Sequence, residues 1–239
     1  MTETNVVQPT APVSSDAGLS FRGLIEVFYK PTEFFKKLVV NPKILVPYVV
    51  FGVLMFLALY LTRELVWQMV SASPKFQERI QNAQISPELL KTIVIWQFIG
   101  AGTLAMLLSP LLAALLALFW GNFVFAGKAN FRHLLSVMLY GEVIYAVGAI
   151  VNLALMLPRG NLMANLSLGV LAASQGADSV LYVLLSKFSV FLIWEIVAIG
   201  LGLTVLYNVK PSHGYRLAIL SMGLLSILHV VVTAVGKMF

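Results

Sequence analysis

Cysteine is absent from the chain, and charged residues are scarce. None of the 239 residues is cysteine, and only 11% are Asp, Glu, Lys or Arg. The absence of cysteine excludes disulfides, cysteine nucleophiles and thiolate metal sites. Soluble domains usually carry about 25% charged residues, and a soluble fold with so few charges would expose a mostly apolar surface to water. The composition therefore argues against a soluble domain.

Signatures of catalysis and of nucleotide binding are also missing. The sequence has no phosphate-binding glycine loop, no nucleophile elbow and no paired-histidine zinc motif. Its histidines, at positions 133, 213 and 229, lack metal-ligand spacing. The formal net charge is +6, but no basic stripe with interleaved aromatic residues lies outside the apolar runs. We therefore expect a protein that is not an enzyme and uses no cofactor, metal or nucleic-acid partner.

Long apolar runs fill most of the chain, whose mean hydropathy is +0.91. A helix needs about 20 mostly apolar residues to cross about 30 Å of hydrocarbon. Five runs reach or approach this length, which predicts an all-α fold: a polytopic integral membrane helical bundle with five transmembrane helices. The predicted spans cover residues 44–64, 91–120, 133–157, 180–207 and 216–236.

Two stretches of the predicted bundle are irregular. The second run carries no charge between Lys91 and Lys128, which makes it long for one span and too short for two. Because proline removes a backbone hydrogen bond, we expect one tilted helix bent at Ser109-Pro110. Residues 160–179 contain Asn, Gly, Ser and Gln and are too polar for a sixth span. A short interfacial helix and a re-entrant helix are both open there.

Two different segments precede the first span. Residues 1–20 are polar and lack the apolar core of a cleavable signal peptide, so we expect a disordered tail. Residues 21–42 instead predict two short amphipathic helices separated at Pro31. These helices either lie on the bilayer or pack against the membrane domain. The expected membrane-surface residues are Phe28, Phe34, Phe35, Lys36 and Lys37.

Basic residues indicate the orientation of the chain in the membrane. The two short loops on the side of the N-terminal tail contain bases and no acids. Cytoplasmic loops carry an excess of Lys and Arg. We therefore expect a bacterial inner-membrane protein with a cytoplasmic N-terminus and a C-terminus on the outer side. Lys187, near the outer end of its predicted span, is expected to reach the interface as an anchor.

Three ionisable residues fall near the middle of predicted spans: Glu142, Glu195 and His229. An ionised carboxylate at the bilayer centre costs at least about 2.5–3.5 kcal/mol, so the glutamates must be protonated, paired or hydrated. In one interpretation, these three residues and Tyr145 line an internal polar site that relays protons or binds a cation or polar ligand. Asn152 and Gln97 would be neighbours of that site. In the other, the glutamates are structural hydrogen-bond partners between helices.

Four segments, taken in order, resemble the bacterial branch of the Ypt-interacting-protein (Yip) membrane domain family, over residues 21–239. They are Phe21–Pro42, Lys128–Gly141 (KANFRHLLSVMLYG), Phe188–Gly202 (FSVFLIWEIVAIGLG) and Lys210–Leu217 (KPSHGYRL). The resemblance implies five spans and an inner-membrane protein without an assigned reaction. The family's proline a few residues beyond the tyrosine of the third span is absent. The Asp-Leu-Tyr-Gly-Pro signature of eukaryotic members is also missing, which argues against Rab-type GTPase binding.

We therefore expect a non-enzymatic membrane organiser or adaptor that binds lipids or partner proteins. Its partners would be the lipid bilayer, other membrane proteins or further copies of the chain. The alternative is a proton- or cation-coupled transporter, or a channel subunit, that uses the midplane glutamates.

Overall fold

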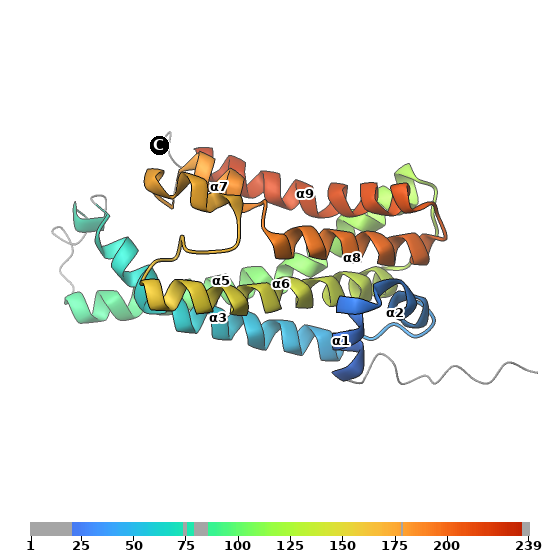
Figure 1. The fold of residues 1–239 in the computed structure, drawn as a ribbon, viewed down its shortest axis with the longest axis horizontal. Helices are drawn as coiled ribbons and strands as arrows, with labels where there is room; N and C mark the ends of the chain where they lie inside the picture. The colour runs from blue at the N-terminus through green and yellow to red at the C-terminus, as the bar shows by residue number, and fades with distance from the viewer. Residues whose placement is uncertain (1–20, 74–75, 79–85, 178, 236–239) are drawn as a thin grey trace, which may run out of the picture.

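The computed structural model describes residues 21–73, 76–78, 86–177 and 179–235, and the long elements in these ranges are all helical (Figure 1). The predicted tail, residues 1–20, lies outside this part. The helices in chain order are α1 (Phe21–Tyr29), α2 (Pro31–Leu38), α3 (Leu45–Ser71), α5 (Pro87–Phe119), the π-helix η2 (Trp120–Val124), α6 (Phe131–Arg159), the 3-10 helix η3 (Leu168–Gln175), α7 (Val180–Ser186), α8 (Val190–Tyr207) and α9 (Pro211–Val235).

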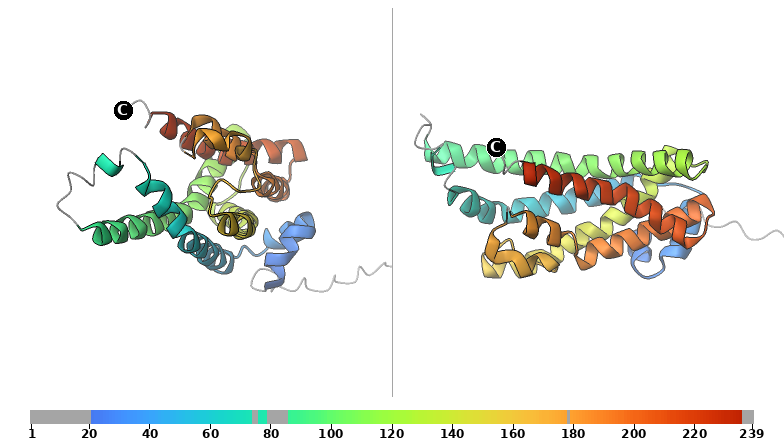
Figure 2. Two further views of the ribbon diagram at one scale, coloured as in Figure 1. Left: turned by 60° about the vertical axis from the view of Figure 1, so that its left-hand side comes forward. Right: turned by 90° about the horizontal axis from the view of Figure 1, so that it is seen from above.

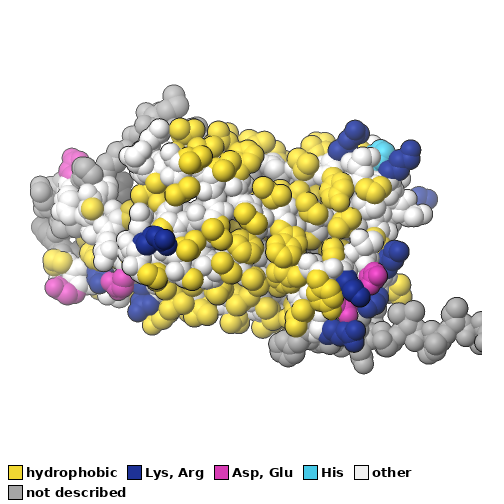
Figure 3. All heavy atoms as spheres, viewed as in Figure 1, with side chains coloured by type: hydrophobic (Ala, Val, Ile, Leu, Met, Phe, Trp, Pro, Cys, Tyr) yellow, Lys and Arg dark blue, Asp and Glu magenta, His cyan; other side chains and the backbone are white. Residues whose placement is uncertain are grey.

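Four helical segments are long and apolar enough to cross a membrane: α3, α5 together with η2, α6 and α8. Figure 3 shows an apolar band across the middle of one face and charged side chains towards the ends. The fifth predicted span falls in α9, a helix of 25 residues. Because α9 is not one of the four, the described residues establish a bundle with four candidate spans and not the predicted five.

Helix α6 is the central helix of the bundle. In its most apolar stretch 72% of the residues are buried inside the protein, against 22% to 33% in the other three candidate spans. Figure 2 shows α3, α5 and α8 around it, and all three pack against it. The outer helices therefore face lipid, while α6 faces protein.

Glycines allow α6 and α8 to approach closely. A Cβ atom added at Gly141 would overlap Ile199, and one added at Gly148 would overlap Phe191. These glycines lie two turns apart on one face of α6, and Phe191 and Ile199 lie two turns apart on α8. Small residues at such a contact let two helix backbones pack tightly in a membrane, where dispersion contacts drive association.

The amphipathic helices α1 and α2 fold into one end of the bundle. Phe34 and Phe35, on α2, are 1% and 0% exposed. The Phe34 ring packs edge-on against Tyr140 of α6 at 4.6 Å between centroids, and Phe35 packs against Gly202 of α8. The prediction that these two phenylalanines bind the membrane surface is therefore wrong. Their periodicity predicts a buried face correctly, but it does not reveal whether lipid or protein covers that face.

The other three predicted membrane-surface residues of α1 and α2 differ in exposure and in contacts. Phe28 is half-buried, and its ring packs edge-on against Trp194 of α8 at 5.4 Å. Lys37 is half-buried, and its Nζ lies 3.3 Å from Oε2 of Glu26. Lys36 is exposed.

A buried carboxylate joins α1 to α2. Glu26 accepts from Nε of Arg22 at 2.7 Å and from Nζ of Lys37 at 3.3 Å. Burial by itself would raise the pKa of Glu26, but these two hydrogen bonds and positive charges outweigh burial and hold that pKa below its usual range. The pair therefore favours the folded helical hairpin when Glu26 is ionised.

The predicted fourth span, residues 180–207, is divided in the structure. Helix α7 ends at Ser186, and α8 begins at Val190 with Ser189 as its cap, whose Oγ accepts from the amide of Leu192 at 3.1 Å. The gap pairs with the preceding loop, because the Leu168 amide donates to the Phe188 carbonyl at 3.1 Å. Serine side chains compete with helical hydrogen bonds, and this pairing satisfies the backbone where the helix stops.

Gly141→Ala should destabilise the bundle because the new methyl group overlaps Ile199. We expect a cost of about 1–3 kcal/mol, typical of overpacking, measured as a lower midpoint of thermal unfolding in detergent. Gly100→Ala is the matched control, since Gly100 is an exposed helical glycine with nothing near its absent Cβ. It should be neutral or stabilising. Equal midpoints for the two variants would contradict a close α6–α8 contact.

The α1–α2 hairpin should loosen at low pH. Since the pKa of Glu26 is held below its ordinary value of 4.5 in the folded chain, its contribution is complete above that value and is lost as pH falls through the lowered pKa. Hydrogen-exchange protection of α1 and α2, corrected for intrinsic rates, should fall in acid and should already be low at neutral pH in Glu26→Gln. Glu33→Gln, at an exposed position of the same hairpin, should leave protection unchanged.

Candidate functional site

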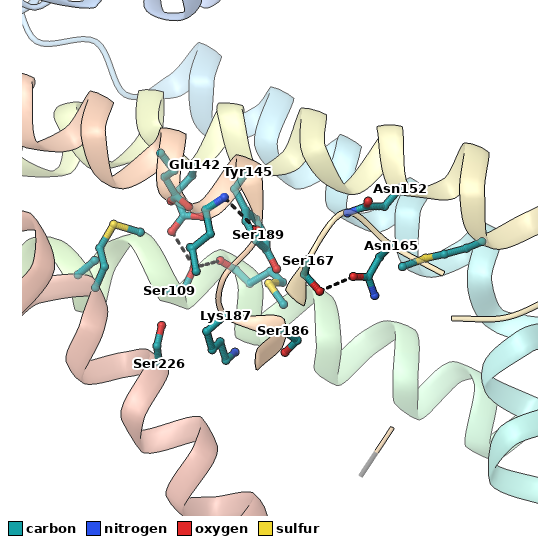
Figure 4. A pocket seen from close by; sticks show the side chains of 16 residues that line it. Ser109, Glu142, Tyr145, Asn152, Asn165, Ser167, Ser186, Lys187, Ser189 and Ser226 are labelled. Atoms are coloured by element: carbon teal, nitrogen blue, oxygen red, sulfur yellow. Dashed lines mark hydrogen bonds between the residues drawn. The ribbon is translucent and has the colours of Figure 1, made fainter. Parts of the chain in front are cut away.

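A partly open cavity of about 350 Å³, lined by polar and apolar side chains, lies between the helices of the bundle. Its walls come from α5, α6, α8 and α9, from the loop before η3, and from the break between α7 and α8 (Figure 4). The polar residues of the wall are Ser109, Glu142, Tyr145, Asn152, Asn165, Ser167, Ser186, Lys187, Ser189, Glu195 and Ser226.

The structure brings three of the four predicted intramembrane residues together. Glu142, Tyr145 and Glu195 all line the cavity. The two glutamates are 6% and 1% exposed. Position 229 falls within α9, but the side chain of His229 lies outside the described part of the structure. Of the two expected neighbours, Asn152 lines the cavity and Gln97 is not among its lining residues.

Two hydroxyl groups support the backbone around Pro110, which lies inside α5. Proline has no N–H for the carbonyl four residues earlier and disturbs the next one. Here Ser109 Oγ donates to the first of these, the Met106 carbonyl, at 2.9 Å. Tyr48 of α3 donates to the second, the Leu107 carbonyl, at 2.8 Å. Helix α5 can therefore continue through its proline at the edge of the cavity.

Ser109 also contacts the side chain of Glu142. Ser109 Oγ lies 3.1 Å from Oε1 of Glu142 as well as 2.9 Å from the Met106 carbonyl oxygen. A hydroxyl carries a single proton to donate. When Ser109 gives it to Met106, the contact with Glu142 is a hydrogen bond only if the carboxyl group is protonated and donates. Ser109 therefore donates to one of these two oxygens at a time, and a protonated Glu142 would make both contacts hydrogen bonds.

The contacts of Glu195 differ from those of Glu142. Its side chain packs beside Gly141, so the close α6–α8 contact places it against the helix that carries Glu142. Among the residues that the structure describes, its Oε1 atom has no hydrogen-bond partner. An unsatisfied buried polar group costs about 1–3 kcal/mol. Glu195 therefore has a buried carboxyl oxygen without a hydrogen bond beside the cavity that this residue lines.

Lys187 lines this cavity, whereas the sequence predicts it as an anchor at the membrane interface. The expectation differs from the structure because it assumed an unbroken helix over residues 180–207. The break at Ser186–Ser189 turns the lysine inward (Figure 4). Two serines flanking a lysine in an apolar run are the signal that identifies this break, since serines favour helix ends.

The loop that forms the far wall is held by asparagines. Asn152 of α6 accepts from the Leu166 amide at 2.9 Å, and Asn165 donates to the Tyr182 hydroxyl of α7 at 3.1 Å. Non-helical backbone at membrane depth is tolerated where it is buried in protein or lines a polar cavity. Sequence reasoning missed Asn165 and the serines at positions 167, 186, 189 and 226, since small polar residues are common in apolar helices.

Metal chemistry gains no support from the described part of the chain, which contains no group of three or more His, Asp or Glu side chains able to hold an ion. The two glutamates stand with hydroxyls, amides and one lysine. The arrangement suits a polar or charged organic ligand, or protons and water, better than a resident metal.

A model of the Yip1 domain matches residues 25–234. The chain belongs to the Yip1 domain family. The resemblance read from the sequence is therefore confirmed at the level of the family, while a bacterial branch stays a prediction. Yip1 family proteins are generally non-enzymatic membrane-trafficking proteins. No curated protein and no solved structure matched the chain.

Infrared spectroscopy should detect a protonated carboxyl group in this Yip1 domain at neutral pH. Since the Ser109 hydroxyl donates to the Met106 carbonyl and also lies against Oε1 of Glu142, a protonated Glu142 satisfies both contacts. Glu142 should therefore contribute a carboxylic acid band that disappears in Glu142→Gln. Glu88→Gln removes an exposed glutamate outside the cavity, and it should reduce only the carboxylate bands. Loss of carboxylate absorption alone in Glu142→Gln would show that this residue is ionised.

Proposed function

We propose that this Yip1-domain protein is a non-enzymatic membrane organiser that binds anionic lipid headgroups at the end of the bundle where α1 and α2 lie. The observation that carries the proposal is the concentration of basic side chains at that end, beyond the apolar band (Figure 3). They come from α1, α2, the loops that lead into α3, α6 and α9, and the starts of α6 and α9: Arg22, Lys30, Lys36, Lys43, Lys128, Arg132, Lys210 and Arg216.

The charge at this end is mainly positive, with Glu33 as the exposed acid of the described part among these bases. Glu26 is buried between Arg22 and Lys37 and so offers no charge to a ligand. The opposite end mixes signs, and Lys91 there is paired with Glu64 at 2.8 Å. Each Lys or Arg near an anionic membrane surface contributes about 1 kcal/mol of attraction. A cluster of bases with little acid therefore favours anionic headgroups.

The core packing of α2 makes this basic surface rigid. Phe34 and Phe35 hold the helix against α6 and α8, so Lys36 projects from a fixed position instead of from a floating amphipathic helix. Exposed apolar side chains, Ile25 and Tyr29 of α1, lie in the same hairpin. This combination of charged and apolar groups is typical of surfaces at the headgroup boundary.

The proposed organiser has five spans, with α9 as the fifth. Helix α9 packs along α8 and α5, and its described end lies away from α1 and α2 (Figure 1). Five spans place the termini on opposite sides. By the positive-inside rule, the basic end is cytoplasmic, which makes the protein an inner-membrane protein of a bacterium in this proposal.

The cavity favours a second function, a proton- or cation-coupled transporter or channel subunit. A broken helix beside midplane carboxyl groups is a feature of secondary transporters. This function requires a flux into liposomes that depends on Glu142 or Glu195. Unchanged flux in Glu142→Gln and Glu195→Gln, each folded, would exclude it.

Lys36→Glu should weaken binding of anionic lipid to the purified full chain. In mixed micelles of phosphatidylglycerol and phosphatidylcholine, native mass spectrometry should show fewer bound phosphatidylglycerol molecules, and raised salt should have the same effect on the wild type. Arg159→Glu is the matched control, because it reverses one exposed charge at the opposite end of α6. If both variants retain the anionic lipid equally, the basic end is not a lipid-binding surface. A protein that co-purifies only with the wild type would then indicate a protein partner.

A further inference from the structure

We propose that the cavity between α5, α6 and α8 binds a small organic cation, an alkylammonium ion, whose ammonium group lies at Glu142 and Glu195. This site is separate from the basic end of the bundle and does not rest on the lipid-binding proposal. It concerns residues that the organiser function leaves unused.

The size of the cavity indicates the size of its ligand. Its volume is about 350 Å³, near the lower end of the roughly 300–1,000 Å³ that small-molecule sites occupy. One water molecule takes about 30 Å³ of liquid, so a bare metal ion would leave most of this space unfilled. A compact organic molecule fits the volume.

The lining of the cavity combines acidic and apolar side chains. Glu195, 1% exposed, has a carboxyl oxygen without a hydrogen-bond partner in the described part of the chain, and Glu142 lines the same cavity. An ammonium group supplies N–H donors to such oxygens, and its positive charge pairs with Glu195 as a carboxylate while Glu142 accepts a hydrogen bond. The apolar part of the wall consists of Met106, Ala113, Met156, Leu192 and Met222.

The apolar wall distinguishes an organic cation from a hydrated inorganic one. Methionine side chains are flexible and polarisable, so they adapt to an alkyl group of irregular shape. Lys187, the cationic group of the wall, stands eight positions before Glu195, beyond the start of α8. An ammonium group at the glutamates is therefore kept at the end of the cavity away from Lys187, with Tyr145 as the remaining titratable neighbour.

Butylammonium chloride and butanol form a probe pair that differs in charge and is similar in size. The full chain, in a maltoside detergent without ammonium groups at neutral pH, should show a saturable rise of its thermal midpoint with butylammonium. An equal concentration of butanol or of sodium chloride should give no such rise. Equal shifts with butylammonium and butanol would show apolar binding only, and no shift with either would show a water-filled cavity. Each of these results overturns the proposal.

Variants test the residues. Glu195→Gln should weaken butylammonium binding by at least about tenfold, whereas Glu88→Gln, outside the cavity, should bind like the wild type. Glu142→Gln provides a second variant if Glu195→Gln does not fold. Wild-type affinity in a folded Glu195→Gln protein would overturn the assignment, and the wild-type probe comparison decides the matter if neither variant folds.

Discussion

The close contact between α6 and α8 is the constraint on which the rest of the structure depends. Gly141 and Gly148 remove the side chains that would separate the two backbones, and Ile199 and Phe191 occupy the space. Because lipid is as apolar as leucine, this packing rather than a hydrophobic gradient must hold the helices together. The contact buries α6, places Glu195 beside it, and forms the surface at the other end of the pair that receives Phe34 and Phe35.

Membrane depth and protein packing together explain the polar cavity. Apolar helices surround it, yet serines, asparagines and two carboxyl groups line it, and the chain breaks between α7 and α8 at its edge. Each irregularity of the backbone has a local partner: Ser109 and Tyr48 around Pro110, and residues 166–168 at the break. The polar groups are thus concentrated at one internal place, where they cost least and where chemistry is available.

Much of this could be predicted, and the failures share a cause. Composition predicts the four candidate spans, the order of four segments resembles the family, and helical spacing predicts that Phe34 and Phe35 are buried on one face. It does not predict that protein rather than lipid covers them, because apolar periodicity is the same in both cases. The break at Lys187 was missed since hydropathy measures apolar content and not the hydrogen bonds that a distant loop supplies.

The sequence by itself determined that the chain belongs in a lipid bilayer and is helical, and it put Glu142 and Glu195 near the middle of predicted spans. These properties depend on local composition and on a fixed rise per residue. Only the tertiary structure decided which side chains meet, since the rotation and shift of each helix against its neighbours depend on contacts between distant residues. It thereby joined both glutamates with Tyr145 and Lys187 in one cavity, and it packed the apolar face of a predicted membrane-surface helix against α6 and α8.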